Sequence, residues 1–170
     1  MYGAIRQALL VCLLAAGCAT VPVGPPPKVV GMVKTLDGAR WPLGSLRGKP
    51  ALLFVFTTWS TPALLDVRRL LDAQRVYGER LRIVAVALDD QPQAVAVFLD
   101  TFEPPFEVVL PDDRARFVGP DGPIGELTMV PTTALLTSDG EVFGKVEGGW
   151  PAGALEPAIE RLLAADPATR

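Results

Sequence analysis

The residues whose types and spacing could support chemistry lie in one short stretch, Thr57 to Ala63. An apolar run, Ala51 to Phe56, ends there in two threonines, and the sequence Trp-Ser-Thr-Pro follows. Hydroxyl residues just before a proline are typical of a helix start, so we expect a buried strand, a turn and a helix. The free N–H groups and the dipole of such a helix stabilise an anion at its first turn. The stretch therefore predicts a site at a strand-to-helix corner.

The composition excludes several kinds of chemistry at this corner. The 170-residue chain contains no histidine, which excludes a Ser-His-Asp triad, a Cys-His dyad and imidazole metal ligands. Its two cysteines are Cys12 and Cys18, so the rest of the chain can form no disulfide, thiolate metal site or redox pair. The net charge is −3, with 16 Lys and Arg against 19 Asp and Glu, which is unlike a nucleic-acid-binding surface. We expect no metal, no cofactor and no nucleic-acid partner.

Ser60 has two interpretations. As a hydrolytic nucleophile it would need a lysine or carboxylate base, and Lys49 is separated from it by the whole Ala51–Phe56 strand. The alternative is that Ser60 or Thr61 caps the helix, as serine and threonine commonly do. We favour the capping role.

Residues 1–17 resemble a secretory signal. Arg6 precedes an apolar stretch, Ala8 to Ala16, that is too short to span a bilayer. The sequence Leu-Ala-Ala-Gly before Cys18 resembles a bacterial lipobox, which implies cleavage before Cys18 and acylation of this residue. An ordinary secretory signal and an uncleaved anchor are the alternatives.

The lipobox resemblance also implies a location. A protein anchored through its acylated N-terminus would lie in the bacterial cell envelope, and Ala19 after the cysteine implies sorting to the outer membrane, facing the periplasm, in a Gram-negative host. Residues 18–28 are rich in proline, which favours extended polyproline geometry, so they predict a short stiff tether. The folded domain is expected over residues 29–170.

Strand and helix patterns alternate along this domain, which predicts an α/β fold. The expected strands are 29–33, 39–43, 51–56, 81–88, 106–110, 134–137 and 141–146. The expected helices begin at Pro62, with Gly78 as the C-cap, and at Pro92, and also cover 113–117 and 152–165. The first two strands and the last two flank turn sequences and predict hairpins. The elements together predict a central mixed sheet flanked by helices, with an N-terminal β-hairpin.

Four short pieces in order carry a resemblance to a known family. They are Leu43–Pro50, Phe56–Pro62, Val130–Thr133 and the Asp139-Gly140 hairpin. They resemble the TlpA-like branch of the thioredoxin superfamily, membrane-tethered bacterial envelope proteins that mostly reduce disulfides. The resemblance implies a thioredoxin-like fold. It also implies that Ser60 and Ala63 occupy the positions of the two active-site cysteines of this family.

The resemblance also gives Val130-Pro131 a role. In the family this peptide bond is cis, and the residue before the proline offers backbone groups to an extended substrate peptide. We expect a cis bond here, and a trans proline that starts an edge strand is the alternative. The binding groove implied by the resemblance is formed by Thr58, Trp59, Thr61, Pro62, Val130 and Pro131.

Two further features have competing interpretations. Trp59 either lines this groove or is a half-buried aromatic that closes the corner. The pairs Asp89-Asp90 and Asp112-Asp113 could suggest a cation site, yet neither has the alternating ligands of a calcium loop. We expect these pairs to be solvated helix starts and loops.

Disulfide exchange needs an attacking thiolate and a resolving thiol, and a serine with an alanine supplies neither. We therefore expect a non-enzymatic, redox-inactive lipoprotein that binds a protein or peptide partner through the groove. The alternatives are a TlpA-like thiol–disulfide oxidoreductase by family, a non-catalytic accessory to one, and a structural envelope component that uses another surface.

Overall fold

The computed structural model describes residues 28–169. The expectations for the signal peptide, for Cys18 and for most of the tether therefore lie outside the described residues. The strands are β1 Met32–Lys34, β2 Arg40–Pro42, β3 Ala51–Phe56, β4 Arg82–Ala87, β5 Glu107–Pro111, β6 Thr132–Leu136 and β7 Val142–Glu147. The helices are α1 Thr61–Tyr77, α2 Pro92–Phe102, α3 Arg114–Val118 and α4 Leu155–Ala165, with short 3₁₀ turns η1 Leu43–Leu46 and η2 Pro167–Thr169. Within residues 28–169, none of these helices is long and apolar enough to cross a bilayer.

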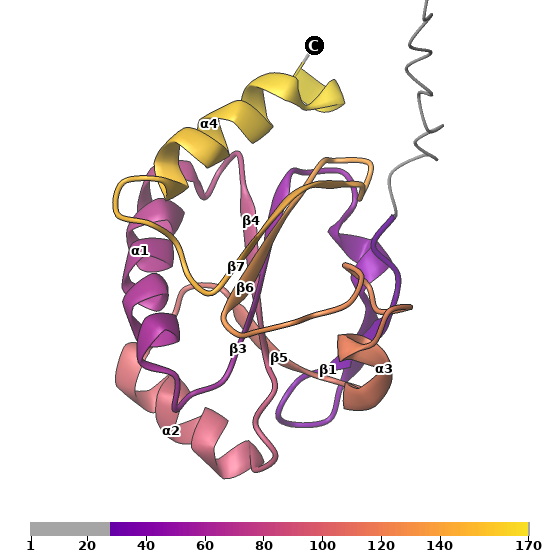
Figure 1. The fold of residues 1–170 in the computed structure, drawn as a ribbon, viewed down its shortest axis with the longest axis vertical. Coiled ribbons are helices and arrows are strands. Elements are labelled where there is room, and N and C mark those ends of the chain that lie inside the picture. Colours follow the sequence, from indigo (N-terminus) through magenta and orange to yellow (C-terminus); the bar gives the residue numbers. More distant parts are fainter. Residues whose placement is uncertain (1–27, 170) are drawn as a thin grey trace, which may run out of the picture.

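The strands form one mixed sheet in the order β2-β1-β5-β4-β3-β6-β7 (Figure 1). β3, β4 and β5 are parallel, whereas β1 pairs antiparallel with β5, and β6 with β3. The β1–β2 pair is the N-terminal hairpin, with Val33 opposite Trp41. Because β3, β4 and β5 run the same way, the segments that follow them meet at one edge of the sheet. The predicted fold is confirmed.

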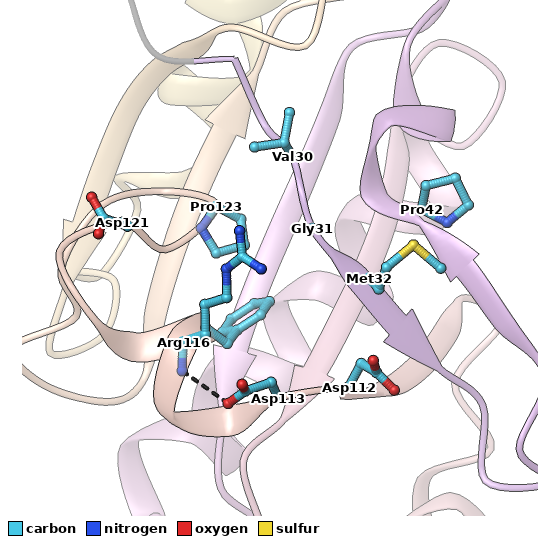
Figure 2. A pocket seen from close by; sticks show the side chains of 10 residues that line it. Val30, Gly31, Met32, Pro42, Asp112, Asp113, Arg116, Asp121 and Pro123 are labelled. Carbon is cyan, nitrogen blue, oxygen red and sulfur yellow. Dashed lines mark hydrogen bonds between the residues drawn. The ribbon is translucent and has the colours of Figure 1, made fainter.

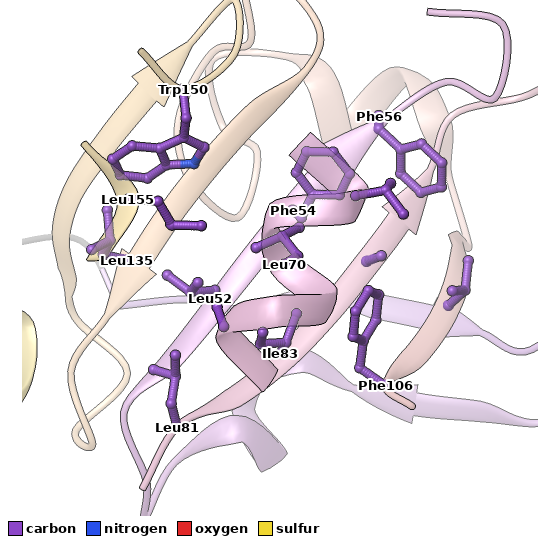
Figure 3. Packing of buried hydrophobic residues seen from close by; sticks show 14 of the residues in the cluster. Leu52, Phe54, Phe56, Leu70, Leu81, Ile83, Phe106, Leu135, Trp150 and Leu155 are labelled. Atoms are coloured by element: carbon purple, nitrogen blue, oxygen red, sulfur yellow. The ribbon is translucent and has the colours of Figure 1, made fainter. Parts of the chain in front are cut away.

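Alternation along β3 divides the core between the two faces of the sheet. Leu52, Phe54 and Phe56 belong to one buried cluster together with residues of α1, α2 and α4, and Figure 3 shows Leu70 of α1 in this cluster. Leu53 and Val55 belong to a second cluster, which includes Phe117 of α3 and residues of η1. Figure 1 shows α1, α2 and α4 on one side of the sheet and α3 on the other. The long helices thus cover a single face, and the start of α1 lies at the end of β3.

Candidate functional site

The predicted corner between β3 and α1 is present. Ser60 is the N-cap residue of α1, and its N–H donates to the Thr57 carbonyl at 3.2 Å. Its side chain makes no capping hydrogen bond, and Thr61 is already the first residue of the helix, so the capping role expected for these hydroxyls is wrong. Ser60 and Ala63 were expected at the positions of the two cysteines of the resembled family. Both are buried, since Ser60 is 7% exposed and Ala63 is 0% exposed.

Trp59 projects from this corner into solvent. Its exposed fraction is 77%, so the interpretation as a half-buried aromatic that closes the corner is wrong. Thr61 and Pro62, which follow, are exposed as well, whereas Thr58 is half-buried. An exposed indole offers a large apolar area with a polar N–H, which suits recognition of another molecule.

The Val130–Pro131 peptide bond is cis, which confirms the prediction. Pro131 is buried, and its carbonyl accepts a hydrogen bond from the Gly148 N–H at 2.8 Å. Val130 is half-buried, and Met129 before it is 53% exposed. The proline thus immediately precedes β6 and lies next to a second exposed apolar side chain.

Gly149 shows that the two halves of the predicted groove lie together. A Cβ atom built on this residue would lie 3.6 Å from Cβ of Pro62 and 3.8 Å from Cγ of Pro131. Its φ of +99° is a conformation that glycine adopts without steric cost. The structure therefore brings the start of α1 and the cis-proline together across the loop after β7. The term cis-proline surface denotes the following residues: Thr58, Trp59, Thr61, Pro62, Met129, Val130, Pro131 and Gly149.

A buried carboxylate that the sequence analysis missed holds this loop in place. Asp66 of α1 is 1% exposed, and its Oδ2 accepts the Trp150 N–H at 3.0 Å. Arg69 Nη1 donates both to Asp66 Oδ1 at 2.8 Å and to the Trp150 carbonyl at 2.6 Å. The indole Nε1–H of Trp150 donates to Oγ1 of Thr133 in β6 at 3.0 Å. Trp150 is therefore fixed to α1 by its backbone and to β6 by its side chain.

Helical periodicity could have identified Asp66. Three residues after Ala63 and four before Leu70, it shares the face of α1 that packs on the sheet. A buried carboxylate needs hydrogen-bond partners, and Arg69 on the same helix is only one of those that Asp66 has. The missing information was the identity of these partners, since Trp150 is 84 residues away in sequence.

Burial raises the pKa of the Asp66 carboxyl, although the bonds from Trp150 and Arg69 act in the opposite direction. The native state thus holds a proton at Asp66 more tightly than the unfolded chain does. By linkage, the contribution of this group to stability is largest below the unfolded-state pKa and is lost as pH rises through the raised native pKa. We expect the free energy of unfolding of the wild type to rise relative to Asp66→Asn as pH falls from 7 towards 4. Urea unfolding of both proteins across this range measures the difference, and a pH-independent difference would contradict the assignment.

A second carboxylate contacts the corner from the end of β4. Asp89 accepts hydrogen bonds from the N–H and the hydroxyl of Thr58, so its description as a solvated loop residue is wrong.

The other acidic residues of the two pairs contact different elements. Asp90, the neighbour of Asp89, forms an ion pair with Arg114 of α3. Asp112 pairs with Arg40, and the Asp113 side chain caps α3 by accepting from the Arg116 N–H. In the part of the chain that the structure describes, no group of three His, Cys, Asp or Glu residues could hold a metal ion.

A cavity of about 370 Å³ lies away from the cis-proline surface, between β1 and α3 (Figure 2). It is lined by Val30, Gly31, Met32, Pro42, Asp112, Asp113, Arg116, Phe117, Asp121 and Pro123. Its walls include apolar side chains and charges of both signs, and none of the predicted groove residues is among them. This cavity therefore gives no support to the predicted site, which depends on the contacts described above.

The sheet order and the flanking helices are those of the thioredoxin-like fold. No profile of a known protein family matches the chain. The chain is 31% identical over 114 residues to the thiol-disulfide oxidoreductase ResA of Oceanobacillus iheyensis, a match that covers 66% of this chain and 57% of ResA. It is 28% identical over 81 residues to the thioredoxin-like protein YneN of Bacillus subtilis, covering 46% of this chain and 48% of YneN. The chain thus spans about half the length of these curated relatives.

Solved structures agree on the fold. A thiol:disulfide interchange protein of the thioredoxin family from Chlorobium tepidum superposes with a TM-score of 0.66 and is 21% identical. The match covers 82% of this chain and 98% of that one. This likeness shows that the chain has the thioredoxin-like fold. A shared fold leaves the activity of this chain a separate question, because function depends on the residues at the site.

Proposed function

We propose that this protein is a redox-inactive thioredoxin-like module that binds an extended segment of a protein partner at the cis-proline surface. The observation that carries the proposal is the combination of an intact frame with no cysteine. Trp59 is exposed, Val130–Pro131 is cis, and Ser60 and Ala63 lie at the start of α1. Neither a hydroxyl nor a methyl group can attack a disulfide or release a mixed disulfide.

Hydrolysis by Ser60 gains no support from the geometry. The whole of β3 separates Lys49 from Ser60, and Ser60 is covered. The Asp66 carboxylate is engaged by Trp150 and Arg69, and Asp89 is engaged by Thr58. The described hydrogen bonds of both carboxylates go to these other partners, and none joins either carboxylate to the Ser60 hydroxyl, as an activated serine would require.

The similarity to ResA favours a second candidate, a role in thiol–disulfide exchange. We expect the protein lacking residues 1–18 to reduce insulin at the background rate. The double substitution Ser60→Cys with Ala63→Cys is expected to raise this rate well above background, since a cysteine at a helix N-terminus has a lowered pKa. Robust turnover by the unsubstituted protein would refute redox inactivity.

Partner binding is tested by a photo-crosslinking residue at Thr61. This position is exposed, whereas Ala63 is fully buried and a bulky label there would disturb the core. The control position is Arg161, which is exposed on α4. A defined adduct from position 61 alone supports the proposal. Adducts from position 161 alone would assign the function to another surface, as a structural envelope component would show.

The proposed location in the cell envelope rests on the lipobox at Cys18. We expect the full chain to incorporate a radiolabelled fatty acid and to fractionate with membranes. Cys18→Ala is expected to abolish both properties, because several acyl chains are needed for firm attachment. Membrane association of the Cys18→Ala protein without label would instead indicate an uncleaved apolar anchor.

A further inference from the structure

We propose that Asp89 is a positioning residue of the cis-proline surface, whose carboxylate holds the turn that presents Trp59. This assignment rests on the proposed function, since it concerns the same surface. Asp89 follows Leu88, whose N–H donates to the carbonyl of Phe56, the last residue of β3, at 2.8 Å and extends the β3–β4 ladder one residue beyond β4. Asp89, the residue after Leu88, therefore lies beside the turn from Thr57 to Ser60.

The carboxylate of Asp89 binds both donors of Thr58. The Thr58 N–H lies 3.0 Å from Oδ2 and 3.2 Å from Oδ1, and the Thr58 hydroxyl donates to Oδ1 at 2.6 Å. A threonine has only these two donors, so Asp89 satisfies both donors of Thr58. Hydrogen bonds to an ionised carboxylate are shorter and stronger than neutral ones. Asp89 thus fixes the backbone and the side-chain rotamer of Thr58 together.

The turn has little else to fix it. The Thr57 hydroxyl is buried and has no hydrogen-bond partner among residues 28–169. The Ser60 side chain makes no capping bond, and the bond from its N–H to the Thr57 carbonyl is long at 3.2 Å. The Trp59 ring is 77% exposed, so packing against its own domain cannot determine its direction. The orientation of Trp59 therefore depends on Thr58 on one side and the start of α1 on the other.

Asp90 provides a matched control. It carries the same charge one residue further on, and its partner is Arg114 of α3 rather than the turn. Asp89→Asn and Asp90→Asn each remove one negative charge without changing side-chain size. A difference in binding between these two variants therefore reports the loss of the bonds to Thr58 and not the loss of a local charge.

The first experiment measures the yield of the Thr61 photo-adduct. Asp89→Asn is expected to lower it about tenfold, because the amide nitrogen cannot accept a hydrogen bond and the charge is lost. Asp90→Asn is expected to retain the wild-type yield. Thr58→Val, which lacks the hydroxyl, is expected to behave like Asp89→Asn. The double variant Asp89→Asn with Thr58→Val is expected to fall no further than either single variant.

The second experiment needs no partner. Labelling with 5-fluorotryptophan gives ¹⁹F resonances, and the one lost in Trp59→Phe belongs to Trp59. Asp89→Asn is expected to shift the Trp59 resonance and leave that of the buried Trp150 unchanged. An equal shift of the Trp150 resonance would mean a general loss of structure and would overturn the positioning role.

The failures of the two proposals are distinguishable. If Trp59→Ala leaves the adduct intact, the proposed function fails, whatever Asp89 does. If Trp59→Ala removes the adduct while Asp89→Asn preserves it, the binding surface stands and the positioning role of Asp89 is overturned.

Discussion

Replacing Trp150 with alanine is expected to lower the free energy of unfolding by about 3–5 kcal/mol, the usual cost of truncating a buried tryptophan. The side chain is 6% exposed and lies in the main buried cluster with Leu135 and Leu155 (Figure 3). Its loss would leave a cavity. It would also remove the hydrogen bond from the indole N–H to the Thr133 hydroxyl, which ties this loop to β6. Urea unfolding monitored by circular dichroism measures the change.

Trp150→Phe separates packing from hydrogen bonding. The phenyl ring keeps most of the buried apolar contact but cannot donate to the Thr133 hydroxyl. We expect a loss of about 1 kcal/mol for the missing bond, with a further small loss for the reduced volume. A Trp150→Ala cost below about 1 kcal/mol would contradict the described role of this residue.

Trp59→Ala is expected to have the opposite profile, with an unchanged fold and a large loss of binding. Since its side chain is 77% exposed, stability should change by less than about 0.5 kcal/mol. Tryptophans at the centre of interfaces commonly contribute 2 kcal/mol or more to binding, so the adduct from position 61 should fall by about thirtyfold or more.

Val97→Ala provides a control for this loss. Val97 of α2 is also an exposed apolar residue, at 64%, and it lies outside the cis-proline surface. Its truncation is expected to preserve the adduct. Equal losses from Trp59→Ala and Val97→Ala would indicate non-specific capture by apolar surface.

The sequence alone predicted the strands, helices and turns that are encoded by local residue patterns. The continuous apolar run of β3, the period of α1 and the Asp139-Gly140 turn each identified their element within a few residues. The resemblance supplied the cis bond at Val130–Pro131, which no local pattern encodes. These features set the fold and one half of the proposed surface.

The remaining features depend on contacts between residues far apart in sequence. Trp150 lies 84 residues from Asp66, and Asp89 lies 31 residues from Thr58, yet each pair is hydrogen-bonded in the folded domain. Nothing near Asp89 distinguishes it from Asp90, yet the two carboxylates bind different elements. The exposure of Trp59 was also unpredictable, because an aromatic residue at a strand end can fold inward or outward at similar local cost.

The cis-proline surface exists only in the folded domain, so ligand binding and folding are linked. The cis-proline surface is assembled from three segments, around Thr58, Pro131 and Gly149, so a peptide containing any one of them would not reproduce it. A ligand of this surface therefore binds only the whole folded domain and stabilises it by mass action, raising its melting temperature with ligand concentration. The amides of Gly148 and Trp150, both bonded across segments, should then exchange with deuterium only through global unfolding, and more slowly when the surface is occupied.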